Sequence, residues 1–156
     1  YFHKEKEMNI QYELQEGLPE VSKLREILDL YESIFKAKFS TNGFIYEIEN
    51  SKNLVFNLAF SKHKLIGFKV GFEKKDRSFY SWLGGIAPDF RGQGIAKKLM
   101  DLQHSWLKDN KFTSVTTHSS NQYKSMLILN LKNGFDLTGT NINSKGEQRL
   151  ILRKGL

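Results

Sequence analysis

Residues 91–96 read Arg-Gly-Gln-Gly-Ile-Ala and lie between an aromatic-rich segment and a strongly amphipathic one. Two glycines two positions apart let the backbone come close to a bulky ligand. A helix that begins at this point offers its unpaired N–H groups and its positive dipole end to an anion. The stretch therefore predicts a phosphate-binding loop between a strand and a helix.

Alternating apolar residues predict strands upstream of this loop. They are expected over residues 9–13, 54–60, 66–72 and 79–86. The pair Gly84-Gly85 inside the last strand indicates a bulge or a place where another backbone comes close. A helix with Pro19 in its first turn is expected after the first strand, and residues 44–50 form a short helix or loop. The predicted core face of that first helix is Val21, Leu24, Leu28, Tyr31 and Phe35.

Downstream of the loop, helix and strand patterns continue to alternate. The helix that begins at Ile95 has the core face Ile95, Leu99, Leu102 and Trp106, so we expect His104 to face water. Further elements are a strand at 111–118, a helix at 121–133 ended by Gly134, and strands at 135–142 and 148–153. The 121–133 helix is expected to place Tyr123, Leu127 and Leu131 on one side.

This order of elements predicts the α/β (α+β) class, with about six or seven strands in one mixed sheet and about four helices. The chain has 156 residues and a hydrophobic content of 39%, enough for one domain with a buried core, so residues 1–156 are expected to form a single domain. The chain begins at Tyr1 rather than methionine, so we expect residues 1–7 to be either disordered or foreign to the natural protein, with Met8 a candidate start.

Composition limits the possible functions. No apolar run is long enough to span a membrane and no leader pattern opens the chain, so we expect a cytoplasmic protein with no membrane contact. Cysteine is absent, which excludes disulfides, thiolate metal sites and a cysteine nucleophile. No set of histidine and carboxylate residues has metal-ligand spacing, so no metal is expected. The net charge of +7 suits an anionic ligand, but the basic residues are scattered, which disfavours nucleic acid as a partner.

Three phosphate-binding motifs compete for the loop. A P-loop needs four residues between its glycines followed by Lys-Ser or Lys-Thr, and nothing here matches. A dinucleotide-binding fold needs a third glycine three residues after Gly94 and an acidic residue at the end of the next strand. This chain has Lys97 at the glycine position, so that motif is not met. The third form, Arg/Gln-x-x-Gly-x-Gly/Ala between a strand and a helix, is met by Arg91, Gly94 and Ala96. In this motif the chain resembles the GCN5-related N-acetyltransferase (GNAT) family.

The resemblance extends beyond the motif, because Pro88 precedes it and Asn133-Gly134-Phe135 follows in the family's order. It implies a transferase of the acyltransferase class, an acetyl-CoA-dependent N-acyltransferase. Such an enzyme moves the acetyl group from the thioester to an amine, and the amine attacks the thioester directly in a ternary complex. It also implies a GNAT-like sheet that is splayed in the middle. Two alternatives stay open: a non-catalytic acyl-CoA-binding module and a basic nucleic-acid-binding protein.

The resemblance also implies where coenzyme A binds. The edge of the strand at Gly85, Ile86 and Ala87 would pair with the pantetheine amides, and Asn121 would hydrogen-bond the same arm or cap the following helix. The pyrophosphate would be cradled by backbone amides, with added charge from Arg91 and Lys97. The residues of this cradle are Arg91, Gly92, Gln93, Gly94, Ile95, Ala96 and Lys97.

No catalytic side chain is assigned from the sequence. Many family members carry a glutamate on the strand before the motif, but residues 79–86 contain no carboxylate, so Glu73 or a relayed water would have to replace it. Asn130 stands where many members have the tyrosine that acts as general acid. The nearest phenols are Tyr80 and Tyr123, and His118 at the end of a strand is a candidate base or relay.

The acceptor is an amine of open identity: a small molecule, an amino acid, an antibiotic or a protein N-terminus. The binding site for this amine is expected to be formed by residues 19–50 and the last hairpin. Five aromatic residues there are candidates to line its pocket, or else to pack in the core: Tyr31, Phe35, Phe39, Phe44 and Tyr46. The protein is expected to be a monomer or a homodimer.

Overall fold

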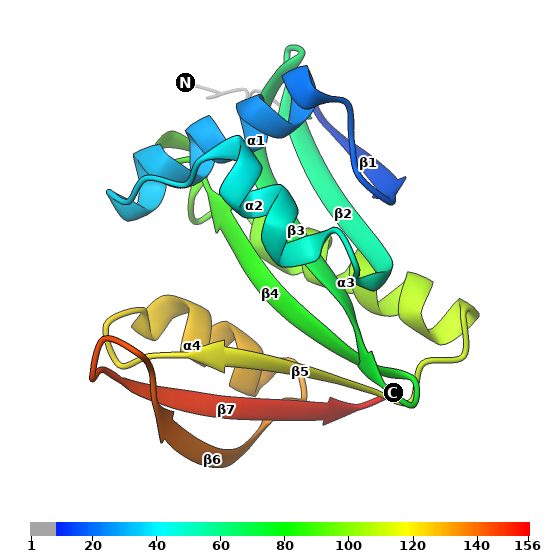
Figure 1. Cartoon of the computed structure of the whole chain (residues 1–156), viewed down its shortest axis with the longest axis vertical. Helices are drawn as coiled ribbons and strands as arrows, with labels where there is room; N and C mark the ends of the chain where they lie inside the picture. Colours follow the sequence, from blue (N-terminus) through cyan, green and yellow to red (C-terminus); the bar gives the residue numbers. More distant parts are fainter. Residues whose placement is uncertain (1–8) are drawn as a thin grey trace, which may run out of the picture.

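One seven-stranded sheet runs through the protein in the order β1-β2-β3-β4-β5-β7-β6 (Figure 1). This computed structural model describes residues 9–156, so the expectation about residues 1–7 lies outside the described residues. The strands are β1 (Ile10–Glu16), β2 (Lys52–Ser61), β3 (Lys64–Lys75), β4 (Ser78–Ile86), β5 (Ser114–Ser119), β6 (Asp136–Ile142) and β7 (Gln148–Gly155). In the described part of the chain, β4 and β5 are the one parallel pair, which confirms a mixed sheet.

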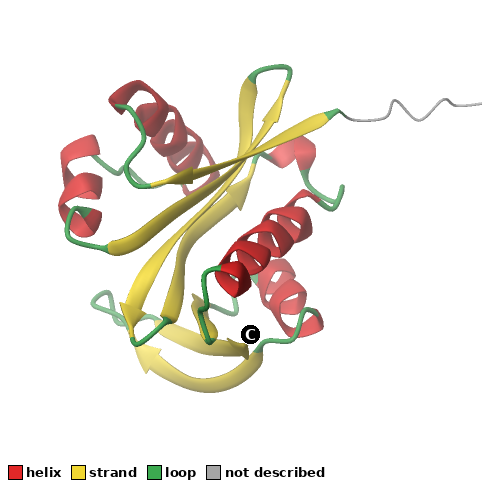
Figure 2. Ribbon diagram, turned by 90° about the vertical axis from the view of Figure 1, so that its right-hand side faces the viewer, coloured by secondary structure: helices red, strands yellow, loops and turns green. Residues whose placement is uncertain are grey.

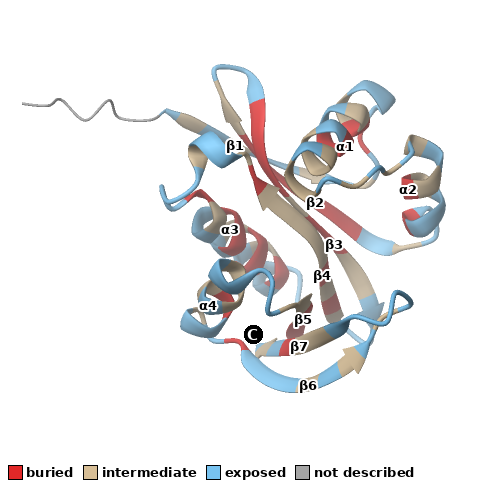
Figure 3. Ribbon diagram, turned by 90° about the vertical axis from the view of Figure 1, so that its left-hand side faces the viewer, coloured by how far each residue is buried: buried red, intermediate tan, exposed pale blue. Residues whose placement is uncertain are grey.

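The helices cover both faces of this sheet. They are α1 (Val21–Phe35), α2 (Thr41–Ile48), α3 (Ile95–Asp109) and α4 (Lys124–Lys132). Helices α1 and α2 lie on one face and α3 and α4 on the other (Figure 2). Buried residues gather along β2, β3 and β4 and on the inner side of α3 (Figure 3). The core thus lies on both sides of the three strands that lead to the glycine-containing loop.

Strands β4 and β5 pair over four positions, from Ser78↔Ser114 to Ser81↔Thr117, and then part (Figure 1). The register between β3 and β4 shifts at Trp82, which is an extra residue on β4. The bulge does not fall at Gly84-Gly85, because both glycines pair in register with β3. The alternative expectation, close approach of another backbone, is confirmed at Gly84, where an added Cβ would lie 3.2 Å from the Phe68 carbonyl oxygen. The bulge increases the local twist at the point where β4 leaves its neighbour.

The core faces of three helices differ from the predicted ones. In α3, Leu102 and Trp106 are only partly buried, and the buried residues are Ile95, Leu99, Met100, Gln103, His104 and Leu107. In α1 the buried residues are Leu24, Ile27 and Leu28, while Val21 is 67% exposed because it begins the helix beyond the edge of the packed face. In α4 the buried residue is Asn130, and Tyr123 and Leu131 are exposed. Apolar periodicity misplaced the α4 face because a polar side chain occupies the buried position.

Helix α2 begins earlier than expected, because the Ser40 Oγ accepts a hydrogen bond from the Gly43 N–H at 3.0 Å. This side-chain cap satisfies one of the free N–H groups of the first turn. The helix buries Phe44 and Ile48 against the sheet.

His104 is buried in α3, and the expectation that it faces water is wrong. Its Nδ1 accepts a hydrogen bond from the Lys154 Nζ at 3.2 Å, and its ring packs against Phe135. Burial, and to a smaller extent the positive charges of Lys154 and Lys69, lowers the pKa of His104 to about 3. The imidazole is therefore neutral in the folded protein at any pH near neutrality.

This neutral histidine predicts a loss of stability in mild acid. The unfolded chain binds a proton at His104 below about pH 6.5 and the folded chain does not, so its contribution to stability decreases as the pH falls from about 6.5 towards 3. Between pH 6.5 and 5 the wild type should lose about 1–2 kcal/mol more than His104→Gln. Urea unfolding at the two pH values measures this difference. His63→Gln, at an exposed turn, should keep the wild-type dependence, and equal losses in all three proteins would contradict the assignment.

Candidate functional site

A cleft of about 1090 Å³ lies where β4 and β5 part. It is lined by the ends of these strands, the loop at residues 91–94, the first turn of α3, the inner side of α4 and the end of α1. Among the described residues, no aspartate or glutamate contributes to its lining. The cleft therefore favours an anionic ligand.

The loop presents free backbone donors to this cleft. Gly92 and Gly94 have φ of +74° and +79°, a conformation that other residues rarely adopt, and a Cβ added to either would meet no atom within 4 Å. The first intrahelical bond of α3 runs from Lys98 N–H to the Gly94 carbonyl. Within residues 9–156, the N–H groups of residues 92–97 have no acceptor. Six donors around open space form an anion-binding cradle.

Most of the residues predicted to bind the donor line this cleft: Gly85, Ile86, Arg91, Gly92, Gly94, Ile95, Ala96, Lys97 and Asn121. Gln93 and Ala87 do not. The Gln93 Nε2 donates to the Asp89 carbonyl at 3.5 Å, and the Ala87 N–H donates to the Ile66 carbonyl on β3 at 2.8 Å. The structure thus brings together the cradle and the end of β4 but turns the Ala87 amide away from the cleft.

The charged groups at the loop have partners of their own. The Arg91 Nε donates to the Ile86 carbonyl at 3.1 Å, which ties the loop to the end of β4. The Lys97 Nζ pairs with the Asp101 carboxylate at 2.7 Å on the exposed side of α3. Asn121 does not cap α4, because the helix begins after Tyr123 and has no side-chain cap. The Asn121 side chain is exposed at the cleft.

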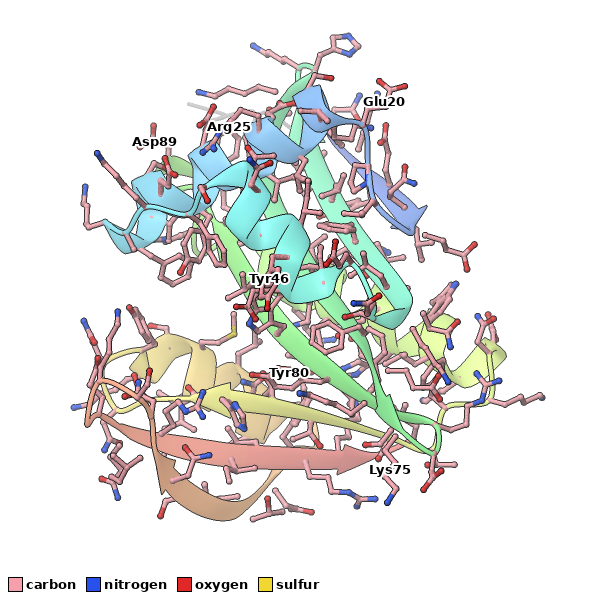
Figure 4. All side chains as sticks on the ribbon, viewed as in Figure 1. Glu20, Arg25, Tyr46, Lys75, Tyr80 and Asp89 are labelled. Atoms are coloured by element: carbon pink, nitrogen blue, oxygen red, sulfur yellow. The ribbon has the colours of Figure 1, made fainter. Side chains whose placement is uncertain are left out.

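Two of the candidate acid–base residues are joined on the α1 side of the sheet. The Tyr80 hydroxyl and the Nδ1 of His118 are hydrogen-bonded at 2.9 Å, and Figure 4 places Tyr80 where β4 and β5 diverge. His118 lines the cleft. Burial lowers the pKa of His118, and the nearby charges of Arg149 and Lys74 lower it further. Burial raises the pKa of Tyr80. At neutral pH the pair is a neutral imidazole beside a neutral phenol.

The other candidates are dispersed. Asn130 is 3% exposed and lines the cleft from α4. Tyr123 lines it from the start of α4, with its ring 5.8 Å from that of Phe35. Glu73 does not reach the cleft, because its carboxylate accepts hydrogen bonds from the Asn53 Nδ2 and the Arg77 N–H where β3 pairs with the beginning of β4.

The predicted aromatic pocket for the acceptor is mostly core. Phe44 is 1% exposed and stacks on Trp82 at 5.2 Å, and Tyr46 is 76% exposed on the outer side of α2. Tyr31 and Phe39 pack beside the core under α1 and α2. Of the five residues, only Phe35 lines the cleft. The structure thus supports the core alternative for most of this aromatic set.

The cleft residues missed in the sequence include three polar ones on neighbouring strands: Lys69, Ser81 and Thr117. Each occupies the face of its strand that α3 covers. Burial lowers the pKa of Lys69 to about 8. A signal for Lys69 was available in the segment Gly67-Phe68-Lys69-Val70-Gly71, in which this lysine falls on the same side as the two glycines. A lysine inside a central strand is unusual, because lysine is rarely buried.

Two searches of residues 9–156 gave negative results. They contain no group of three or more histidine or carboxylate side chains that could hold a metal ion. None of the helices in this part of the chain combines the length and apolarity that crossing a bilayer would need.

The motif predicted a loop with free backbone amides, and the family resemblance implied a sheet that parts in the middle. Comparison with known proteins identifies the family to which this arrangement belongs. The sequence pattern of the Acetyltransferase (GNAT) family matches residues 24–126, which is more than half of the chain. The chain therefore belongs to the GNAT acetyltransferase family. No match was found among curated protein sequences.

Solved structures of the same fold cover nearly the whole chain. The NatC complex bound to Gag peptide and CoA matches at 16% identity and a TM-score of 0.79, over 96% of this chain and 99% of that one. The ribosomal-protein-S18-alanine N-acetyltransferase from Escherichia coli matches at 11% and 0.76, over 93% and 94%. A GNAT family acetyltransferase from Elizabethkingia anophelis with acetyl-CoA bound matches at 19% and 0.71, over 95% and 99%. At these identities the likeness shows the fold alone.

The cradle predicts a specific effect of replacing Gly94. Gly94→Val and Gly146→Val both force a branched side chain into a backbone with φ near +78°, so both should lose some stability. Only Gly94→Val places a side chain over the free amides, so coenzyme A should bind to it at least about tenfold more weakly while Gly146→Val keeps the wild-type affinity. Titration calorimetry with coenzyme A measures both. Wild-type affinity in folded Gly94→Val would refute the cradle.

Proposed function

We propose that this protein is an acetyl-CoA-dependent N-acetyltransferase that transfers an acetyl group directly to an amine in a ternary complex. The observation that carries the proposal is the row of free N–H groups at residues 92–97 beside the cleft between β4 and β5. The diphosphate of coenzyme A matches these donors in charge and hydrogen bonding. The acetyl-CoA bound in the Elizabethkingia anophelis relative of the same fold supports this choice of donor.

The open edge of β4 would hold the pantetheine arm. Gly85 and Ile86 line the cleft on a strand whose parallel partner ends its pairing at Ser81. An extended amide-containing chain can add to such an edge as an extra strand. Asn121 would contribute a side-chain hydrogen bond from the opposite side. This placement brings the thioester to the middle of the sheet, beside Asn130 and His118.

The donor supplies an activated acyl carbon, and the residues of the cleft supply position and proton transfer. The neutral His118 imidazole accepts the proton that the attacking amine loses, and Tyr80 holds the ring through its Nδ1. A backbone N–H near Ile86 stabilises the developing charge on the acyl oxygen. The Asn130 amide donates a hydrogen bond to the departing sulfur, which leaves as a thiolate because its pKa is near 8.5.

The proposal as a whole is tested by binding and turnover on the full chain. Acetyl-CoA should bind in calorimetry, and free thiol should appear when a panel of amines, amino acids and peptides with free N-termini is added. Mass spectrometry of the panel should show one acetyl group on the accepted amine. Absence of binding would overturn the donor assignment. Tight binding with no thiol release across the panel would favour the non-catalytic module instead.

The role of His118 predicts a pH profile. Because the folded pKa lies below the ordinary value of about 6.5, its base form persists into mild acid, and wild-type activity should fall only below that pH. His118→Gln should lower kcat/KM about 100-fold or more and remove this acid limb.

Tyr80→Phe keeps the ring and removes the hydroxyl, so it should change the position of the acid limb with a smaller loss of activity. Coenzyme A affinity should be unchanged in both variants, which shows that the cleft is intact. A His118→Gln enzyme with the wild-type rate and profile would exclude this histidine and leave a relayed water as the base.

A further inference from the structure

Lys69 is a basic side chain inside the sheet with no counter-charge. It lies on β3 between Asn57 of β2 and Gly84 of β4, and all three occupy the face that α3 covers. Within residues 9–156, its ammonium takes part in no ion pair and no hydrogen bond, and no carboxylate is close enough to affect its pKa. An ammonium withdrawn from water without a partner is costly, so a lysine here calls for a reason beyond packing.

The side chain opens onto the cleft. Gly84, its partner across the strands, has no side chain, and a Cβ built there would lie 3.6 Å from the Lys69 Cγ. Lys69 therefore lies against the bare backbone of β4 and is one of the residues that line the cleft. Strands β2 and β4 flank it and α3 covers it, so its remaining exposure is towards the cleft, next to Ser81 and Thr117.

The surroundings of Lys69 are polar, whereas the methyl group of an acetyl donor would need only an apolar environment. Asn57 is 1% exposed, and among residues 9–156 neither its Nδ2 nor its Oδ1 has a partner. Gln103 of α3 is fully buried, donates to the Ser81 Oγ at 3.5 Å, and leaves its Oε1 without a partner. Buried polar groups of this kind are usually satisfied by protein, water or ligand. Asn57 and Gln103 do not line the cleft, but Asn57 is the β2 partner of Lys69 and Gln103 bonds to Ser81, and both Lys69 and Ser81 line it. This polar layer next to the cleft favours a polar acyl group over a purely aliphatic one.

We propose that the cleft accepts coenzyme A thioesters of short dicarboxylic acids, such as malonyl or succinyl groups, and that Lys69 binds their distal carboxylate. This inference rests on the proposed function, because it uses the same cleft and the same transfer. The amine nitrogen forms an amide bond to the acyl carbon as the carbon–sulfur bond breaks. Coenzyme A leaves as the thiolate, the amine proton passes to His118, and the distal carboxylate is unchanged throughout.

The test compares donors on variants of the full chain. Calorimetry with coenzyme A, acetyl-CoA and succinyl-CoA is carried out on the wild type, on Lys69→Met and on Lys75→Met. Lys75 lies at the end of the same strand, is exposed and does not line the cleft, so it is the matched control. The wild type should bind succinyl-CoA at least as tightly as acetyl-CoA. Lys69→Met should weaken succinyl-CoA binding about 10- to 100-fold and leave acetyl-CoA within about twofold, since a charge-assisted pair is lost.

The remaining outcomes separate the two proposals. If the wild type binds acetyl-CoA but not succinyl-CoA, the inference about Lys69 is overturned and the proposed function stands. If no coenzyme A compound binds, the proposed function itself fails. If Lys69→Met weakens all three ligands equally, or slows acetyl transfer without changing relative affinities, Lys69 does not select the acyl group. Lys69→Gln, which stays polar, repeats the test should the methionine variant not fold.

Discussion

The parting of β4 from β5 beyond Ser81 is the constraint on which the rest of the structure depends. A buried backbone edge without partners is costly, so a sheet opens in the middle only where something supplies the missing hydrogen bonds. Here the first turn of α3 and the inner side of α4 border the opening, so the unpaired edge of β4 faces a cleft rather than a flat surface, and its residues 82–85 stay partly exposed. In the proposed complex, an extended ligand rich in amides would pair with this edge and its anionic end would meet the free N–H groups of residues 92–97.

The charge of the site follows from the same geometry. The loop and helix dipole make one end of the cleft positive through backbone groups, with Arg91 and Lys97 nearby. The other end is positive through Lys69, whose ammonium is withdrawn from water. No carboxylate lines the cleft among the described residues, although Lys97 is paired with Asp101 on the exposed side of α3. His118 and Tyr80, the acid–base pair of the proposed mechanism, are both neutral at neutral pH, which suits transfer of a proton from an amine.

The sequence predicted the order of helices and strands, the mixed sheet and the position of the loop, because these depend on apolar alternation and on glycines with positive φ. It failed where polar residues are buried. His104, Gln103, Lys69 and Asn130 each occupy a buried or cleft-facing position that apolar periodicity assigns to solvent or ignores. The sequence predicts the bulge two residues too late, because glycines in a strand often mark a bulge, whereas the extra residue in β4 is Trp82. Register and polar partners arise from tertiary contacts that local pattern does not contain.

Several of these failures share one location, the layer between α3 and the sheet, whereas Asn130 lies on α4 and Trp82 packs on the opposite face of the sheet. Beneath most of α3 this layer is apolar, but around β3 it holds Asn57, Lys69, Gln103 and His104, several of them with unsatisfied atoms. A layer chosen only for stability would replace such groups with packed aliphatic side chains, since an unpaired buried charge or amide is a net cost. Lys69 also depresses the pKa of His104, so one buried cation adds to the cost of protonating its neighbour. Polar groups kept at such a cost beside a cleft are better explained by what the cleft binds than by the fold that surrounds them.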